Sequence, residues 1–128
     1  MRILIVGGPK TGKTTLSKTL GEKLGITPRH TDDLIGVLDW SAASLAVSGW
    51  IAEPGDCVIE GVSVVRALRK WLAAYPGSPA DKIIYLGQPH QELLPGQQSM
   101  TKGVATVWRE ILPELIARGV VIEFDSEA

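Results

Sequence analysis

Positions 7–14 carry the most specific chemical signal in the chain, a glycine-rich segment that ends in a lysine and a hydroxyl. The segment reads GGPKTGKT and fits the pattern G-x-x-x-x-G-K-[ST]. Glycines at this spacing let the backbone curl, so that successive N–H groups point inward and hold phosphate oxygens. Lys13 can reach the β- and γ-phosphates, and the Thr14 hydroxyl can ligate Mg²⁺. The pattern predicts a nucleotide-binding site and disfavours a glycine-rich turn without a ligand.

We expect the whole of this phosphate-binding loop, together with the residue after it, to contact the nucleotide. The implied cofactors are ATP and Mg²⁺. The predicted contact residues are Gly7, Gly8, Pro9, Lys10, Thr11, Gly12, Lys13, Thr14 and Thr15.

Carboxylates farther along the chain could complete the chemistry. Asp32, followed by Asp33, could accept a proton from an acceptor hydroxyl opposite the γ-phosphate. Either aspartate could instead cap the helix that follows. Glu60 ends an apolar run and stands where a carboxylate would hold Mg²⁺ through water, although aspartate is commoner there. The alternative for Glu60 is a charge at a strand end that faces solvent.

Alternating apolar runs and helical patterns must position these groups. Strands are predicted over 2–6, 28–31, 57–60, 82–86 and 120–124. Helices are predicted over 14–24, 34–47, 63–74 and 104–118, the last of them broken or bent near Pro113.

Such alternation requires right-handed crossovers and therefore a parallel sheet. We predict an α/β fold, a three-layer α-β-α sandwich with a five-stranded parallel sheet, in a single domain over residues 1–128. Ligands bind at the carboxyl ends of the strands in such sheets, so the loops after positions 6, 31, 60 and 86 should share one rim.

Composition limits the class of protein. The length of 128 residues allows one domain, and the net charge of −1 offers no general attraction to nucleic acid or to an anionic membrane. Cys57 is the only cysteine, so an intramolecular disulfide is excluded and a reducing compartment is expected. No apolar run is long enough for a signal peptide or a membrane span, so we expect a cytoplasmic protein with no membrane partner.

These motifs together resemble those of the small P-loop kinases of the adenylate-kinase and shikimate-kinase group, and the resemblance extends over the whole five-stranded core. The segment 32–34 (DDL) is similar to one in polynucleotide 5′-hydroxyl kinases whose first aspartate activates the acceptor hydroxyl, which implies that role for Asp32. The segment 58–61 (VIEG) resembles the third strand of nucleotide kinases. In those enzymes a basic residue soon after the glycine contacts the acceptor, which implies that role for Arg66.

The segment 87–103 is predicted to be a mobile, lid-like loop because it is long and rich in glycine, proline and glutamine. Kinases of the resembled group carry lid arginines that stabilise the transferring phosphoryl group, and this segment contains no arginine. Lys102 is the nearest substitute, with Arg109 farther away. Lys102 could contact phosphate or stay solvated.

The tryptophans and histidines give weaker signals. Trp71 and Trp108 are predicted to lie in the core. Trp40 and Trp50 fall in the acceptor region of the resembled kinases, where an aromatic face could stack on a base, but packing at a helix edge is the preferred interpretation. His30 and the other histidine share no metal-ligand spacing.

We therefore predict an ATP-dependent kinase that moves the γ-phosphate to a hydroxyl or phosphate of a small molecule or nucleotide. A nucleic-acid end is a further acceptor, which the net charge does not indicate. Two alternatives stay open, an NTP hydrolase in which Asp32 or Glu60 positions water and a nucleotide-responsive binding module without transfer activity. The predicted catalytic residues are Lys13, Asp32, Arg66 and Lys102, and the predicted metal site is Thr14 with Glu60.

Overall fold

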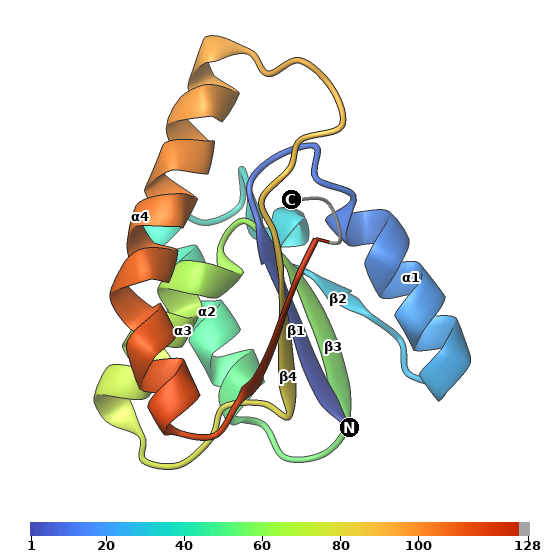
Figure 1. Ribbon diagram of the computed structural model, residues 1–128, viewed down its shortest axis with the longest axis vertical. Helices are drawn as coiled ribbons and strands as arrows, with labels where there is room; N and C mark the ends of the chain where they lie inside the picture. Colours follow the sequence, from blue (N-terminus) through green and yellow to red (C-terminus); the bar gives the residue numbers. More distant parts are fainter. Residues whose placement is uncertain (126–128) are drawn as a thin grey trace.

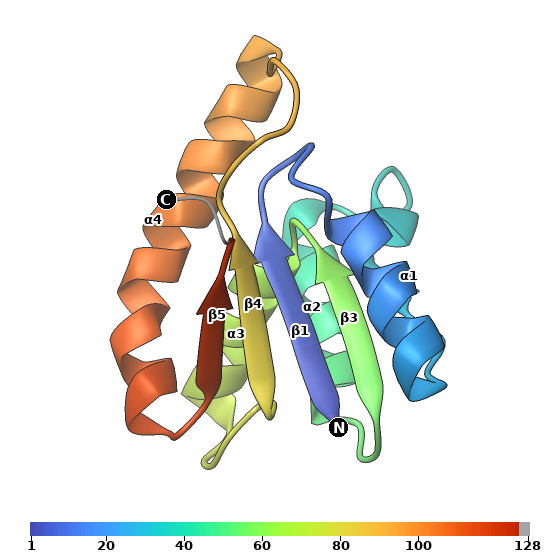
Figure 2. The same ribbon diagram turned by 45° about the vertical axis from the view of Figure 1, so that its right-hand side comes forward.

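The computed structural model describes residues 1–125, and its five strands form one sheet in which every strand pairs in parallel (Figure 1, Figure 2). The sheet order is β2-β3-β1-β4-β5, so the strand that leads into the phosphate-binding loop lies at the centre. The strands are β1 (Arg2–Gly7), β2 (Arg29–His30), β3 (Cys57–Gly61), β4 (Lys82–Leu86) and β5 (Val121–Phe124).

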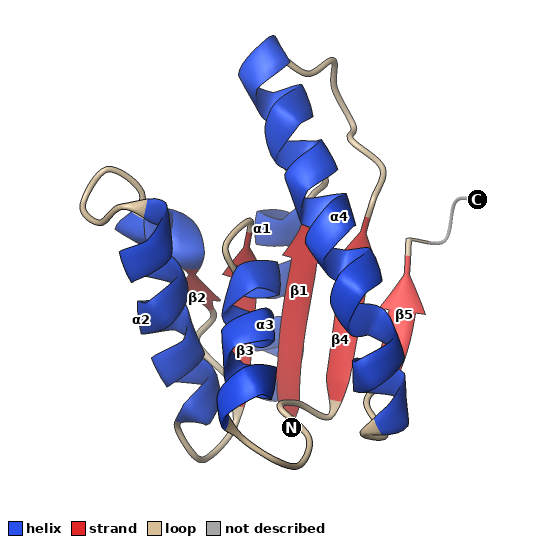
Figure 3. Cartoon of the chain, turned by 90° about the vertical axis from the view of Figure 1, so that its left-hand side faces the viewer, coloured by secondary structure: helices blue, strands red, loops and turns tan. Residues whose placement is uncertain are grey.

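Helices cover both faces of this sheet (Figure 3). Helix α1 (Lys13–Leu24) lies on one face, and α2 (Trp40–Ala52), α3 (Val64–Ala74) and α4 (Pro95–Ala117) lie on the other. Because successive strand side chains point to opposite faces, Leu4 and Val6 join the larger core under α2–α4, whereas Ile3 and Ile5 join the smaller core that contacts α1. The three-layer α/β architecture is confirmed.

The buried tryptophans help to close the larger core. Trp71 on α3 and Trp108 on α4 are buried as predicted. The ring of Trp108 stacks on Tyr85 of β4, with ring centroids 4.8 Å apart. Burial raises the pKa of the Tyr85 phenol. The stacking of Trp108 on Tyr85 holds the middle of α4 against the sheet.

The second helix begins later than the sequence pattern predicts. Instead of starting at position 34, the chain makes a 3₁₀ turn, η1 (Thr31–Leu34), then passes through Gly36 at φ +82°, and α2 starts at Trp40. The cap is Asp39, whose side chain accepts a hydrogen bond of 2.7 Å from the Ala42 N–H. Asp39 therefore fills the capping role predicted for Asp32 or Asp33.

The last helix begins much earlier than predicted, at Pro95 instead of position 104. Proline suits the first turn of a helix because it has no N–H to leave unpaired, and the Gln97 side chain accepts a 3.0 Å hydrogen bond from the Leu94 N–H. The helix also runs unbroken through Pro113. The lid-like loop predicted over 87–103 is therefore confined to 87–94. Among the described residues, no helix combines the length and the apolar character needed to cross a membrane.

Candidate functional site

The carboxyl ends of the central strands bring the predicted residues to one rim. In the sheet, Val6 of β1 pairs with Gly61 of β3, and His30 of β2 pairs with Glu60. The phosphate-binding loop therefore follows β1 directly beside the end of β3. The turn η1, which carries Asp32, follows β2 on the other side of β3.

The phosphate-binding loop connects β1 to the N-terminus of α1. Gly12 stands immediately before the helix at φ +89°, a backbone conformation that favours glycine. Lys10, at the tip of the loop, also has a positive φ of 61°. The first N–H groups of α1 and the positive end of its dipole therefore face the space that the loop encloses, as phosphate binding requires.

Lys13 lies inside this loop and is only 7% exposed. Its ammonium donates hydrogen bonds to the Gly8 carbonyl and, at 3.3 Å, to the Thr11 hydroxyl. Burial lowers the pKa of Lys13, and the carboxylates of Glu60 and Asp32 oppose that shift. A buried cation close to two carboxylates is a strong local charge that an incoming phosphate can use.

Glu60 at the end of β3 is 1% exposed, so the solvent-facing alternative is wrong. Its Oε2 accepts a hydrogen bond of 3.3 Å from the Thr14 hydroxyl and lies 2.6 Å from His30 Nδ1. No motif in the sequence assigns a role to His30. Only the pairing of β2 with β3 reveals it, because the two residues are far apart in the chain and share no motif.

The oxygens at this rim fit a magnesium ion. Within residues 1–125, Glu60 Oε1 and the buried Thr31 Oγ1 have no hydrogen-bond partner. Unpartnered buried oxygens are costly unless a ligand or water completes them. Mg²⁺ takes oxygen ligands and is commonly held by one or two carboxylates together with substrate phosphates. Thr14 and Glu60 would hold it here, and the ion would neutralise the charge of bound phosphates.

Close packing fixes the turn that carries Asp32. Gly61 has φ +146°, and a Cβ added there would lie 1.7 Å from Thr31 Oγ1. Only glycine lets η1 approach the end of β3 so closely. Asp32 itself is exposed on the turn, and it contributes to the electrostatic environment of Lys13.

One cavity adjoins the phosphate-binding loop and α1, and another lies between α2, α3 and the first turns of α4. The first, which we call the α1-side cavity, has a volume of about 430 Å³ and is lined by Thr11, Gly12, Thr15, Leu16, Thr19, Leu86, His90 and Asp125. The second, the α4-side cavity, has a volume of about 360 Å³ and is lined by Trp40, Val62, Arg66, Gly96, Ser99 and Met100.

The first turns of α4 build one wall of the α4-side cavity. They pass close above the phosphate-binding loop, since a Cβ on Gly8 would lie 2.7 Å from Thr101 Oγ1. They also lie against Arg66, whose Nη2 would be 2.9 Å from a Cβ on Gly103. The cavity therefore depends on α4 starting at Pro95.

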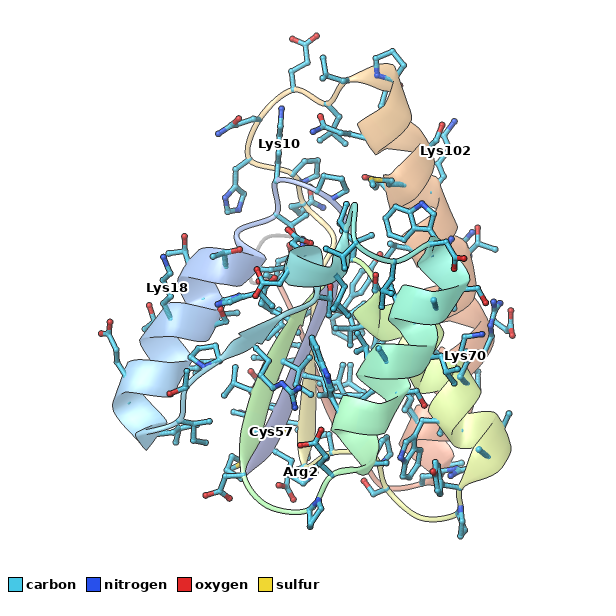
Figure 4. All side chains as sticks on the ribbon, turned by 180° about the vertical axis from the view of Figure 1, so that it is seen from behind. Arg2, Lys10, Lys18, Cys57, Lys70 and Lys102 are labelled. Carbon is cyan, nitrogen blue, oxygen red and sulfur yellow. The ribbon has the colours of Figure 1, made fainter. Side chains whose placement is uncertain are left out.

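The two cations predicted to take part in catalysis, Arg66 and Lys102, lie in different surroundings. Arg66 lines the α4-side cavity, but Lys102 is exposed and points outward from α4 (Figure 4). Lys10 points toward the 87–94 segment in the same view, and its ammonium donates to the Glu92 carbonyl at 3.3 Å. The His90 N–H donates to the Lys10 carbonyl at 2.8 Å, so this segment is tied to the phosphate-binding loop.

The chain is similar to known proteins at the level of structure. No protein-family model matches the sequence, and no curated protein matches it. The fold is similar to that of a shikimate kinase from Acinetobacter baumannii in complex with shikimate, with a TM-score of 0.60 and 14% identity over 99% of this chain and 84% of that one. It is also similar to a deoxyadenosine kinase from M. mycoides with dCMP and a flexible dCDP bound, with a TM-score of 0.54 and 14% identity over 97% and 88% of the two chains. The chain therefore has the fold of the small P-loop kinases.

Proposed function

We propose that this protein is an ATP-dependent phosphotransferase that moves the γ-phosphate to a hydroxyl or phosphate of a small molecule or nucleotide. One observation supports this more than any other. A buried ammonium, a hydroxyl and a buried carboxylate with one unpartnered oxygen meet at the end of the phosphate-binding loop, namely Lys13, Thr14 and Glu60.

In this proposal the residues divide the work between charge and proton transfer. Lys13 and the loop N–H groups hold the phosphates, and Thr14 with Glu60 holds the Mg²⁺ that neutralises their charge. The exposed carboxylate of Asp32 accepts the proton from the acceptor hydroxyl. Lys102 would need to move to reach a phosphate, because its side chain points away from the loop (Figure 4).

The α4-side cavity supports transfer to an acceptor over simple hydrolysis. Trp40 and Met100 give it largely apolar walls, and Arg66 adds a guanidinium that suits a carboxylate or phosphate. We place the acceptor there, and the base of the nucleotide in the α1-side cavity. This arrangement favours a small anionic acceptor over a nucleic-acid end.

A transfer assay with γ-labelled ATP and Mg²⁺ tests the proposal. Nucleosides, nucleotides, hydroxy acids and 5′-hydroxyl oligonucleotides would serve as acceptors. Label on an acceptor supports the kinase. Phosphate release that no acceptor changes would favour the hydrolase, and bound nucleotide without either product would favour a binding module.

Asp32→Asn tests the proton acceptor, and the substitution of the adjacent, also exposed aspartate, Asp33→Asn, is its matched control. Loss of general base catalysis should slow transfer by about 10²–10⁴-fold in Asp32→Asn. ATP affinity should stay close to that of the wild type, and Asp33→Asn should keep its activity. Equal losses in both variants would contradict the role of Asp32.

A further inference from the structure

The shortest side-chain contact of Glu60 is with a histidine on the neighbouring strand. His30 and Glu60 are register partners in the β2–β3 pairing, and His30 Nδ1 lies 2.6 Å from Glu60 Oε2. The Thr14 hydroxyl reaches the same oxygen at the longer distance of 3.3 Å. Oε1 of the same carboxylate has no partner among the described residues.

The chemistry of this contact assigns the proton. Glu60 must be ionised to hold a cation, and an ionised carboxylate only accepts hydrogen bonds, so in that state Nδ1 of His30 carries the hydrogen and donates it to Oε2. A donor at 2.6 Å from a charged acceptor is a short, charge-assisted hydrogen bond. The protein therefore holds the carboxylate of Glu60 through Oε2, and Oε1 has no partner among residues 1–125.

A glutamate in this place needs such a support more than an aspartate would. Its side chain has one more rotatable bond than that of aspartate, so the carboxylate at a strand end has more orientations to choose from. His30 is fixed by the strand pairing and is itself only 27% exposed, so it restricts that freedom and shields the carboxylate from water.

We propose that His30 is a positioning residue for Glu60, holding Oε2 so that the carboxylate stays beside the Thr14 hydroxyl, where the two residues would hold the Mg²⁺ of the bound nucleotide. This inference rests on the proposed function, because it requires a nucleotide–metal complex on the phosphate-binding loop. It predicts an outer-shell partner of the kind that fixes metal ligands in other proteins, where its loss costs about 10–100-fold in metal affinity.

A pair of substitutions of nearly equal size separates the hydrogen bond from packing. His30→Asn keeps an N–H donor close to the position of Nδ1, and His30→Leu removes the donor. Mn²⁺ as the probe ion, followed by EPR with a non-hydrolysable ATP analogue, reports metal affinity. Nucleotide affinity is measured separately in EDTA.

We expect His30→Leu to weaken Mn²⁺ binding about tenfold or more, to leave nucleotide affinity in EDTA within about twofold of wild type, and to be largely rescued in His30→Asn. Wild-type Mn²⁺ affinity in His30→Leu, or equal losses in both variants, would overturn the inference. Failure of the wild type to bind nucleotide at all would overturn the proposed function as well, which distinguishes the two failures.

The wild-type protein offers a second test that needs no substitution. Nitrogen-15 NMR of the imidazoles should find hydrogen on Nδ1 of His30, and the exposed His90 provides the internal reference. An Nδ1 without a proton in His30 would overturn the inference, whatever the variants do.

Discussion

Gly61→Ala should disturb the site from its centre, because the turn that carries Asp32 rests on this glycine. A Cβ at position 61 would lie 1.7 Å from Thr31 Oγ1 and 2.7 Å from Thr31 Cβ. Ordinary contacts of a Cβ begin at about 3.4 Å. The backbone at Gly61, with φ +146°, is also one that alanine rarely adopts.

The expected loss of stability has two parts. Backbone strain at such a φ costs of order 1–3 kcal/mol, and overpacking at a buried position typically costs a further 1–3 kcal/mol. Together these predict that Gly61→Ala lowers the free energy of unfolding by about 2–6 kcal/mol. Since a domain of ordinary stability has only about 5–15 kcal/mol, the variant loses a large part of it and should melt roughly 10 °C or more below the wild type.

Thermal and urea unfolding, followed by circular dichroism, measure this loss. Gly77→Ala is the matched control, because Gly77 also has a positive φ of 84° but no atom lies within 4 Å of its added Cβ. That control should show the backbone cost alone, about 1 kcal/mol. Adding Thr31→Gly to Gly61→Ala removes the colliding side chain and should recover part of the loss.

Equal unfolding free energies for Gly61→Ala and Gly77→Ala would refute this reasoning, because they would show that η1 does not press against the end of β3. The reasoning would also be refuted if Thr31→Gly lowered the free energy of unfolding of Gly61→Ala further instead of restoring part of it. In either case the position of Asp32 would need another explanation.

Two further predictions concern the phosphate-binding loop and the start of α2. Burial lowers the pKa of Lys13, so on the alkaline side the unfolded chain holds a proton that the folded chain has released, and the contribution of Lys13 to the free energy of unfolding should rise as pH approaches the ordinary lysine value of about 10.4. Burial raises the pKa of Cys57 and Tyr85, which contribute the opposite slope in both wild type and variant. In Lys13→Met, the free energy of unfolding, measured with urea at several pH values, should lack that rise. The variant should unfold no more easily than wild type at pH 7, and ATP should no longer stabilise it. An unchanged rise would contradict the assignment. Asp39→Ala removes the acceptor for the Ala42 N–H and should cost about 1 kcal/mol in the same assay, whereas Asp33→Ala should cost clearly less.

Much of the architecture could be predicted from local patterns. The order of strands and helices and the parallel sheet follow from runs such as 2–6 and 57–60, whose apolar residues suit strands buried on both faces. The boundaries near η1 and α4 were predicted poorly. The aspartates at 32 and 33 look like helix caps, but the 3₁₀ turn and Gly36 delay the helix to Asp39. The Gly, Pro and Gln of 95–103 look like a loop, but Pro95 opens a helix that packs above Gly8.

In the candidate site, too, some residues could be predicted from a local pattern and others could not. Lys13 and Thr14 were recognisable because phosphate binding needs contiguous residues, and a contiguous motif can be read from the chain. Arg66 lines a cavity, but the resemblance to kinases suggested it, and Lys102 is exposed and is not among the residues that line that cavity. The role of these cations in catalysis stays a prediction.

The sequence by itself determined the phosphate-binding loop, the alternation of strands and helices, and the presence of carboxylates after the second strand and of another at the end of the third. These features depend on neighbouring residues, so local chemistry is enough to specify them. Only the tertiary structure decided which side chains meet. The pairing of β2 with β3 sets His30 against Glu60, and the contact between Gly61 and Thr31 seats the turn of Asp32. Both contacts join residues that are distant in the chain, and their geometry exists only after the sheet has formed.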